Sequence, residues 1–227
     1  KNLQKKYPVY GPLGKMFPPK TYMNAVSNMS LKLYEGETYG LVGESGCGKT
    51  TTGRSILGLG KPDSGEILYK DKDLTKLNDT EFRPLRKEIQ LVFQDSLSSL
   101  SPRHRIGAIL EEPLIIQGIG NKEERRAQVL EVLHKVGLPD EHYFRYPHEL
   151  SGGQVQRLGI ARALMINPKL IVCDEPVSAL DVSIQAQILN MLVSLQKEMN
   201  LSLLFISHDI GVVRYISHRI GVMYLGT

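Results

Sequence analysis

The chain has 227 residues, of which 41% are apolar and 23% carry a charge, a composition typical of a globular protein that buries a core. The formal net charge is +4 and no dense Lys/Arg block is present, so the sequence does not predict a nucleic-acid partner. Two cysteines and the absence of an apolar run as long as a membrane span argue against a disulfide framework and a transmembrane helix.

These totals lead us to expect a cytosolic protein that reaches a membrane only through partners. The sequence begins with Lys1 and stops at Thr227, just after a predicted strand. We therefore expect it to be a piece of a longer polypeptide.

Residues 1–22 are rich in proline, glycine, lysine and aromatic residues. This composition favours two proline-marked turns around a short extended piece, with little helix. Further along, apolar and polar residues alternate over 29–33 and 67–69, which predicts half-exposed antiparallel strands.

The segment 43–50, Gly-Glu-Ser-Gly-Cys-Gly-Lys-Thr, matches the phosphate-loop pattern G-x-x-x-x-G-K-[ST] at every specified position. A buried strand is predicted before it at 38–42 and a helix after it, which is the context that the pattern requires. Its glycines let amide groups converge on a phosphate, Lys49 would reach the outer phosphates, and Thr50 would bind a magnesium ion. The alternative is a glycine-rich turn that ends in Lys-Thr by chance. The expected nucleotide contacts are Gly43, Glu44, Ser45, Gly46, Cys47, Gly48, Lys49, Thr50 and Thr51.

A compact apolar strand is predicted at 88–93, and Gln94 ends it. From 95 to 165 the pattern changes, because prolines punctuate helical periodicities, of which 122–136 and 154–165 are the clearest. This stretch is predicted to be a mostly helical lobe inserted into a core rich in strands.

Strands return at 170–173, 203–206 and 220–223, and a helix is predicted over 184–199. Strands that alternate with helices indicate a parallel sheet covered on both faces. The predicted fold class is α/β, with a mainly parallel sheet core, an antiparallel β part and an inserted helical part.

Two acids, Asp174 and Glu175, follow the predicted strand at 170–173. An acid at the carboxyl end of a parallel strand lies beside the phosphate crevice. Asp174 can then hold magnesium through water, and Glu175 can orient or deprotonate an attacking water. In the alternative interpretation both acids cap the next helix, which Pro176 would help to start; the phosphate loop upstream favours the catalytic one.

A second candidate anion site lies at Ser151, Gly152, Gly153 and Gln154, just before a predicted helix. Ser151 is a good N-cap, and the two glycines leave the amides bare. Taken alone, the segment fits a flexible linker equally well.

Two further side chains follow predicted strands. His208 comes after the strand at 203–206, where a histidine can contact a terminal phosphate and hold the water-orienting acid. Gln94 ends the strand at 88–93, and a neutral amide there can sense the metal or the water; by itself this signal is weak.

In order and setting these motifs resemble those of an ATP-binding-cassette (ABC) ATPase. The phosphate loop resembles its Walker A motif, Leu-Ser-Gly-Gly-Gln at 150–154 its signature, and Asp174-Glu175 its Walker B motif. Ser-Ala-Leu-Asp at 178–181 resembles the D-loop, and His208 the switch histidine. The resemblance runs from about residue 3 to the end.

This resemblance implies ATP and Mg²⁺ as cofactors. It implies Glu175, His208 and Gln94 as catalytic residues, and Thr50, Gln94 and Asp174 as the metal site. An early aromatic residue stacks on adenine in such proteins, and Tyr7 matches best, ahead of Phe17 and Tyr22. The implied domains are an ATP-binding core at 1–94 and 166–227 (RecA-like plus antiparallel β) and a helical signature-motif subdomain at 95–165, with a C-terminal extension missing.

Within the family, the chain is similar to ATPase subunits of oligopeptide and dipeptide importers, in residues 40–51, 93–103, 159–163, 167–169 and 181–189. The resemblance implies a head-to-tail pair with a second ABC ATPase subunit, in which each ATP lies between one phosphate loop and the other chain's signature helix. It also implies integral membrane permease subunits docked near the segment after Gln94, an extracytoplasmic solute-binding protein acting indirectly, and a peripheral location on the cytoplasmic face of the cell membrane.

Three positions depart from the family pattern: Thr50 stands where Ser is commoner, Val177 where Thr is frequent, and Ser96-Leu97 where Pro and an aromatic residue are usual. Alternatives to peptide import are an importer of nickel or another small solute and a soluble ABC ATPase acting in translation or DNA maintenance. A third is a regulatory cassette that does not hydrolyse ATP, against which the presence of Glu175 and His208 counts.

Overall fold

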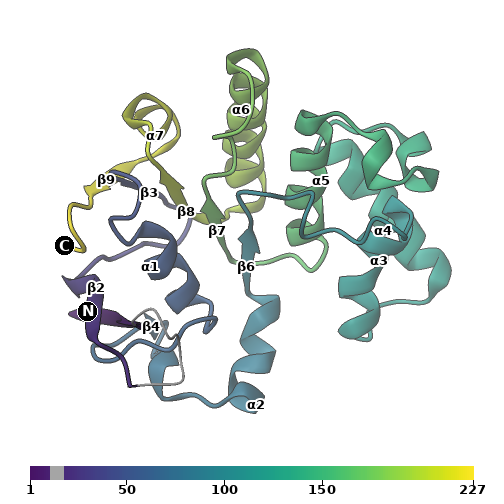
Figure 1. Ribbon diagram of the computed structural model, residues 1–227. Coiled ribbons are helices and arrows are strands. Elements are labelled where there is room, and N and C mark those ends of the chain that lie inside the picture. The colour runs from purple at the N-terminus through teal and green to yellow at the C-terminus, as the bar shows by residue number, and fades with distance from the viewer. Residues whose placement is uncertain (11–17) are drawn as a thin grey trace.

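A five-stranded parallel sheet lies at the centre of the structure, a computed structural model that describes residues 1–10 and 18–227 (Figure 1). The strand order is β6-β7-β8-β3-β9. Every neighbouring pair is parallel, so each strand is reached by a crossover and not by a hairpin. The strands are β3 (Thr38–Val42), β6 (Ile89–Val92), β7 (Leu170–Asp174), β8 (Ser202–Ser207) and β9 (Arg219–Val222).

Helices cover both faces of this sheet, as the sequence predicts. Successive side chains of a strand point to opposite faces, and in β7 Ile171 packs into one apolar cluster while Val172 packs into the other. Helix α1 (Lys49–Ile56) lies against β7 and β8 on one face, and α5 (Gly152–Leu164), α6 (Val182–Met199) and α7 (Ile210–Ile216) contribute to the cluster on the other. Burial on both faces explains why β7 and β8 are apolar along their length.

A helical lobe stands beside the sheet, at the right of Figure 1. It contains α3 (Ile106–Ile116), α4 (Lys122–Lys135) and the contacting part of α5. Asn121 and Glu124 form a capping box that starts α4 where the sequence predicts a helix. Short 3₁₀ turns lie at Leu74–Lys76, Arg83–Lys87, Asp140–Phe144 and Pro147–Glu149, and the short helix α2 at Asp79–Phe82. The domain boundaries at 94/95 and 165/166 stay a prediction.

Antiparallel strands lie near the N-terminus, as predicted, but their extent differs from the prediction. Strand β1 (Leu3–Val9) pairs with β2 (Thr21–Met29), and β4 (Leu68–Tyr69) pairs with β5 (Lys72–Asp73). The short extended piece predicted near the N-terminus is thus a seven-residue strand. It contains Pro8, which a two-stranded sheet tolerates because each strand has a free edge.

The strand predicted over 29–33 is wrong. Strand β2 ends at Met29, after Asn28 turns into the left-handed region at φ 55°. The alternation has another cause, because Leu31 and Leu33 pack partly against an apolar cluster while Lys32 is exposed to water. Half-burial of a loop thus produced the pattern of a strand.

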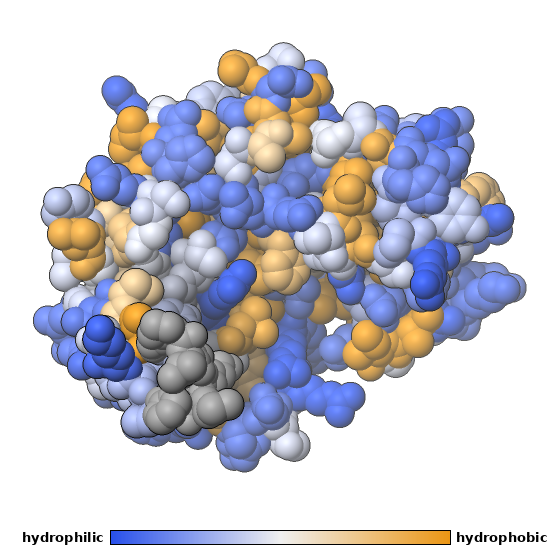
Figure 2. All heavy atoms as spheres, viewed as in Figure 1, coloured by the Kyte–Doolittle hydropathy of each residue, from blue (hydrophilic) through white to orange (hydrophobic). Residues whose placement is uncertain are grey.

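Figure 2 shows hydrophilic side chains over most of one face of the molecule, with apolar side chains in small separate areas. Among the described residues, none of the helices combines the length and the hydrophobicity needed to cross a bilayer. The large apolar side chains are mostly in the two clusters that flank the sheet.

The first prediction tests that core. Phe205 is fully buried in β8, beside Gly40 and Cys173 in the register, so Phe205→Ala should lower the free energy of unfolding by about 3–5 kcal/mol. Phe144 is 53% exposed, so the same truncation there should remove no more than about 1.5 kcal/mol. Urea unfolding of both variants is the measurement, and equal losses would contradict this account of the core.

Candidate functional site

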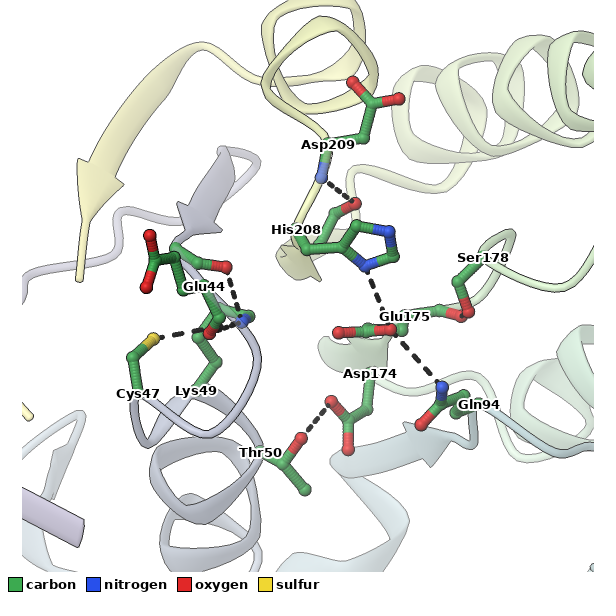
Figure 3. A network of polar contacts seen from close by, with 12 residues as sticks. Glu44, Cys47, Lys49, Thr50, Gln94, Asp174, Glu175, Ser178, His208 and Asp209 are labelled. Carbon is green, nitrogen blue, oxygen red and sulfur yellow. Dashed lines mark hydrogen bonds and ion pairs between the residues drawn. The ribbon is translucent and has the colours of Figure 1, made fainter. Parts of the chain in front are cut away.

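Four segments predicted to carry chemistry meet at one edge of the sheet (Figure 3). The phosphate loop follows β3, Gln94 follows β6, Asp174 ends β7 and His208 follows β8. These strands are parallel, so their carboxyl ends lie at the same edge. The sheet therefore brings together side chains that are far apart in the sequence.

Main-chain atoms enclose the phosphate loop on two sides. Gly48 has φ 105°, and a Cβ there would lie 2.1 Å from the carbonyl oxygen of Ala25 in β2. A Cβ at Gly43 would lie 2.1 Å from the carbonyl oxygen of Met223, just after β9. Both positions therefore require glycine. At Gly43 a side chain has no space, and at Gly48 the positive φ is a second reason.

The side chain of Lys49 is folded into this loop. It is 4% exposed, and its Nζ donates to the carbonyl oxygens of Gly43 (2.7 Å) and Glu44 (2.8 Å). Within the described residues no carboxylate pairs with it. A buried ammonium that contacts only these neutral oxygens and the Cys47 sulfur (3.8 Å) is a favourable partner for a phosphate.

The tip of the loop is open to solvent. Glu44, Ser45 and Gly46 are exposed, whereas Cys47 and Gly48 are buried, and the Cys47 amide donates to the Glu44 carbonyl (3.3 Å). Thr50 and Thr51 lie in the first turn of α1, where the amides have no partner within the helix. The backbone thus fits an anion bound at a helix N-terminus.

Thr50 and Asp174 form the pair expected at a magnesium site. The Thr50 hydroxyl donates to Oδ1 of Asp174 at 2.8 Å. Burial raises the pKa of the Asp174 carboxyl and outweighs the opposite effects of the Thr50 hydrogen bond and the Arg54 guanidinium. No group of three His, Cys, Asp or Glu side chains that could hold a metal occurs in the described part of the chain. This donor set suits Mg²⁺, which takes one or two protein ligands and completes its shell with water and phosphate oxygens.

Glu175 lies between Gln94 and His208. The Gln94 amide donates to Oε2 of Glu175 at 3.3 Å, and Nδ1 of His208 lies 3.3 Å from the same oxygen. The three side chains come from the ends of β6, β7 and β8. The alternative that these acids cap the next helix is wrong, because α6 starts at Val182 with Asp181 at its N-cap.

The segment Ser151–Gln154 is not a flexible linker. Helix α5 begins at Gly152, and Ser151 and Gln154 form a capping box in which each side chain accepts from the other's amide. A Cβ at Gly153 would meet Ile184 of α6, so the glycine allows close packing there. Within the described residues the network that joins Thr50 to Asp174 and Glu175 to Gln94 does not reach this helix end. In Figure 1 helix α5 stands apart from helix α1, with β7 and β6 between them, so one chain does not bring the two helix N-termini together.

Tyr7 lies on β1 and is 39% exposed, with the Lys5 ammonium 5.6 Å from the centre of its ring. Tyr22 lies on β2 opposite Pro8, and Phe17 is outside the described residues. Since Ala25 of the same small sheet abuts Gly48, the sheet that carries Tyr7 contacts the phosphate loop. Stacking of Tyr7 on adenine stays a prediction.

Sequence reasoning did not single out Asp209 as a helix cap. Its carboxylate accepts from the amides of Gly211 (2.7 Å) and Val212 (3.2 Å), so it starts α7 directly after His208. An Asp before an apolar periodic segment was the available signal. The carbonyl groups of Ala25 and Met223 beside the loop gave no signal, because any residue carries them.

Comparison with known proteins gives consistent matches. Residues 26–178 match the family described as "ABC transporter". The chain is 57% identical to the oligopeptide transport ATP-binding protein OppF of Haemophilus influenzae over 92% of this chain and 63% of that protein. It is 48% identical to the dipeptide transport ATP-binding protein DppF of Escherichia coli over 99% of this chain and 66% of that protein. It thus spans less than two thirds of the length of these curated relatives.

The fold also resembles that of a solved structure. The dimeric structure of MJ0796, a bacterial ABC transporter cassette, superposes with a TM-score of 0.87 at 34% identity and covers 100% of this chain and 94% of that one. The predicted α/β fold of this type is thereby confirmed.

The second prediction concerns the charge of Asp174. The pKa of the Asp174 carboxyl is higher in the folded than in the unfolded protein. In nucleotide-free protein the ionised carboxylate therefore lowers the stability of the fold at neutral pH. This penalty vanishes below the unfolded pKa of about 4, where the carboxyl is protonated in both states. Asp174→Asn, which can still accept from Thr50, should be more stable than the wild type at pH 7, with the gain disappearing below pH 4. Urea unfolding across this pH range is the measurement. Asp71→Asn, in an exposed turn, is the control; a gain for Asp174→Asn that is independent of pH would contradict the prediction.

Proposed function

Because the chain belongs to the ABC transporter family, we propose that it binds and hydrolyses ATP for an importer that takes up oligopeptides or dipeptides through partner membrane permeases. The main support for ATP hydrolysis is the position of the Glu175 carboxylate, which lies between Gln94 and His208 and beside the Thr50–Asp174 pair. The solute class is supported by the relatives, which are oligopeptide and dipeptide transport ATP-binding proteins.

In this proposal, the loop amides and Lys49 bind the triphosphate, and Thr51 lies in the first helical turn beside them. Thr50 and Asp174 would hold Mg²⁺, and Gln94 would contact it with its amide oxygen, since its nitrogen donates to Glu175. When bound, the ion neutralises charge on the outer phosphates.

Glu175 performs the proton chemistry. Its carboxylate orients the attacking water and accepts a proton from it as the oxygen attacks the terminal phosphorus, while the bond from that phosphorus to the bridging oxygen breaks and ADP leaves. His208 holds the carboxylate through Oε2, and it would contact the terminal phosphate once nucleotide is bound. Most of the rate enhancement then comes from positioning and charge stabilisation.

A second cassette completes the site in this proposal. Within one chain the N-terminus of α5 lies apart from the phosphate loop, so Ser151, Gly152, Gly153 and Gln154 would contact ATP held by another subunit, arranged head to tail. The dimeric form of the structural neighbour supports this arrangement. The permeases would dock near Gln94, where Phe93 and Leu97 are exposed apolar side chains. The subunit would then be peripheral, on the cytoplasmic face of the membrane, with an extracytoplasmic binding protein acting indirectly.

The third prediction separates binding from hydrolysis. Glu175→Gln should keep ATP binding, because the side chain keeps its shape, but should lower turnover by on the order of 10²–10⁴ and leave an ATP-held dimer. Lys49→Ala should lose ATP binding by on the order of 100-fold, since the charged donor is gone. Calorimetry, phosphate release and light scattering are the measurements. Glu198→Gln, on the exposed face of α6, is the control, and undiminished turnover in Glu175→Gln would remove that residue from the role of base.

The fourth prediction tests the transport assignment. The protein purified under mild detergent should retain integral membrane proteins, and in liposomes the complex should couple ATP turnover to the uptake of labelled di- and oligopeptides. Turnover stimulated by ribosomes or DNA would favour the soluble ABC ATPase instead. Uptake of nickel without peptide uptake would overturn the solute class alone.

A further inference from the structure

The backbone of Glu175 is in an unfavourable conformation. Its φ is +48°, in the left-handed region that residues other than glycine and asparagine rarely adopt. The next residue is Pro176, which favours an extended conformation in the residue before it. Such a conformation persists only where neighbouring groups hold it.

Contacts on both sides of the residue hold this backbone. The Glu175 amide donates to the carbonyl oxygen of Ile206 in β8 at 3.0 Å. The Glu175 carbonyl oxygen accepts twice from Ser178, from its amide at 3.3 Å and from its hydroxyl at 3.1 Å. In Figure 3 the Ser178 hydroxyl lies beside this carbonyl group, on a different side of Glu175 from His208.

Of the two hydrogen bonds that restrain the Glu175 carbonyl, the one from the Ser178 hydroxyl is the shorter. Without it, one amide bond of 3.3 Å would resist the extended conformation that Pro176 favours. The carboxylate contacts with Gln94 and His208 are also 3.3 Å, near the long end of the hydrogen-bond range, so they are weak restraints. The pose of the Glu175 side chain therefore depends on the backbone from which it projects.

We propose that Ser178 is a positioning residue for Glu175: its hydroxyl holds the left-handed backbone that places the carboxylate between Gln94 and His208. This inference rests on the proposed function, in which Glu175 accepts the proton of the attacking water. In this role Ser178 acts through the Glu175 backbone and not by direct contact with the nucleotide or the metal.

The experiment compares Ser178→Ala with Ser178→Thr in the full complex. Loss of the hydroxyl should lower kcat about three- to tenfold and leave the KM for ATP unchanged, because one hydrogen bond that matters only for the base is lost. Threonine keeps the hydroxyl and should stay within about twofold of the wild type. The matched control is Thr227→Val, which removes a hydroxyl that likewise donates to a carbonyl three residues earlier (2.8 Å) but lies outside the site, and should leave kcat unchanged.

A double variant tests whether Ser178 works through Glu175. In a Glu175→Gln background, Ser178→Ala should cause no further loss in single-turnover hydrolysis. A further three- to tenfold loss would place the hydroxyl's action elsewhere, such as at the site of the partner subunit, and would overturn the proposal.

Two other results would contradict the proposal in distinguishable ways. A Ser178→Ala protein with the kcat of the wild type would remove the positioning role and leave the proposed function standing. A wild-type complex that binds ATP but does not turn it over would overturn the proposed function, and the role of Ser178 with it.

Discussion

The parallel register of the central sheet is the constraint on which the rest of the site depends. Val42 pairs with Ser207 and Asp174 with Ile206, so the last residues of β3, β7 and β8 end close to one another. A shift of one residue in any of these pairs would move every side chain of that strand to the other face. The apolar residues on both faces of β7 and β8 oppose such a shift, which means that the core itself sets the spacing of the proposed catalytic groups.

The same edge of the sheet carries charges that folding alone does not favour. Lys49 is buried against neutral carbonyl groups, and Asp174 is buried enough for its pKa to be raised. The ammonium and the carboxylate each lack a full counter-charge in these positions. In a magnesium-bound polyphosphate, the phosphates would neutralise the ammonium and the metal ion would neutralise the carboxylate. We therefore infer that the nucleotide stabilises this edge when it binds, and that the free protein tolerates the charges because the core on either side of the sheet is extensive.

Much of this arrangement could be predicted from the sequence, because local patterns determine it. The phosphate loop requires glycines at fixed positions, and the apolar runs before Asp174 and His208 placed both residues at strand ends. Other features depend on packing between distant segments and gave no local signal. The half-burial of Leu31 and Leu33 imitated a strand, the Pro8-containing strand β1 required β2 as a partner, and the left-handed backbone of Glu175 follows from contacts with Ile206 and Ser178.

The close approach of Gly48 to Ala25 has a geometric consequence. The small sheet that carries Tyr7 touches the phosphate loop through main-chain atoms, so no change of rotamer can alter the separation between them. If Tyr7 receives the base, the distance that a bound ligand must span between ring and loop changes only with the rotamer of Tyr7 itself.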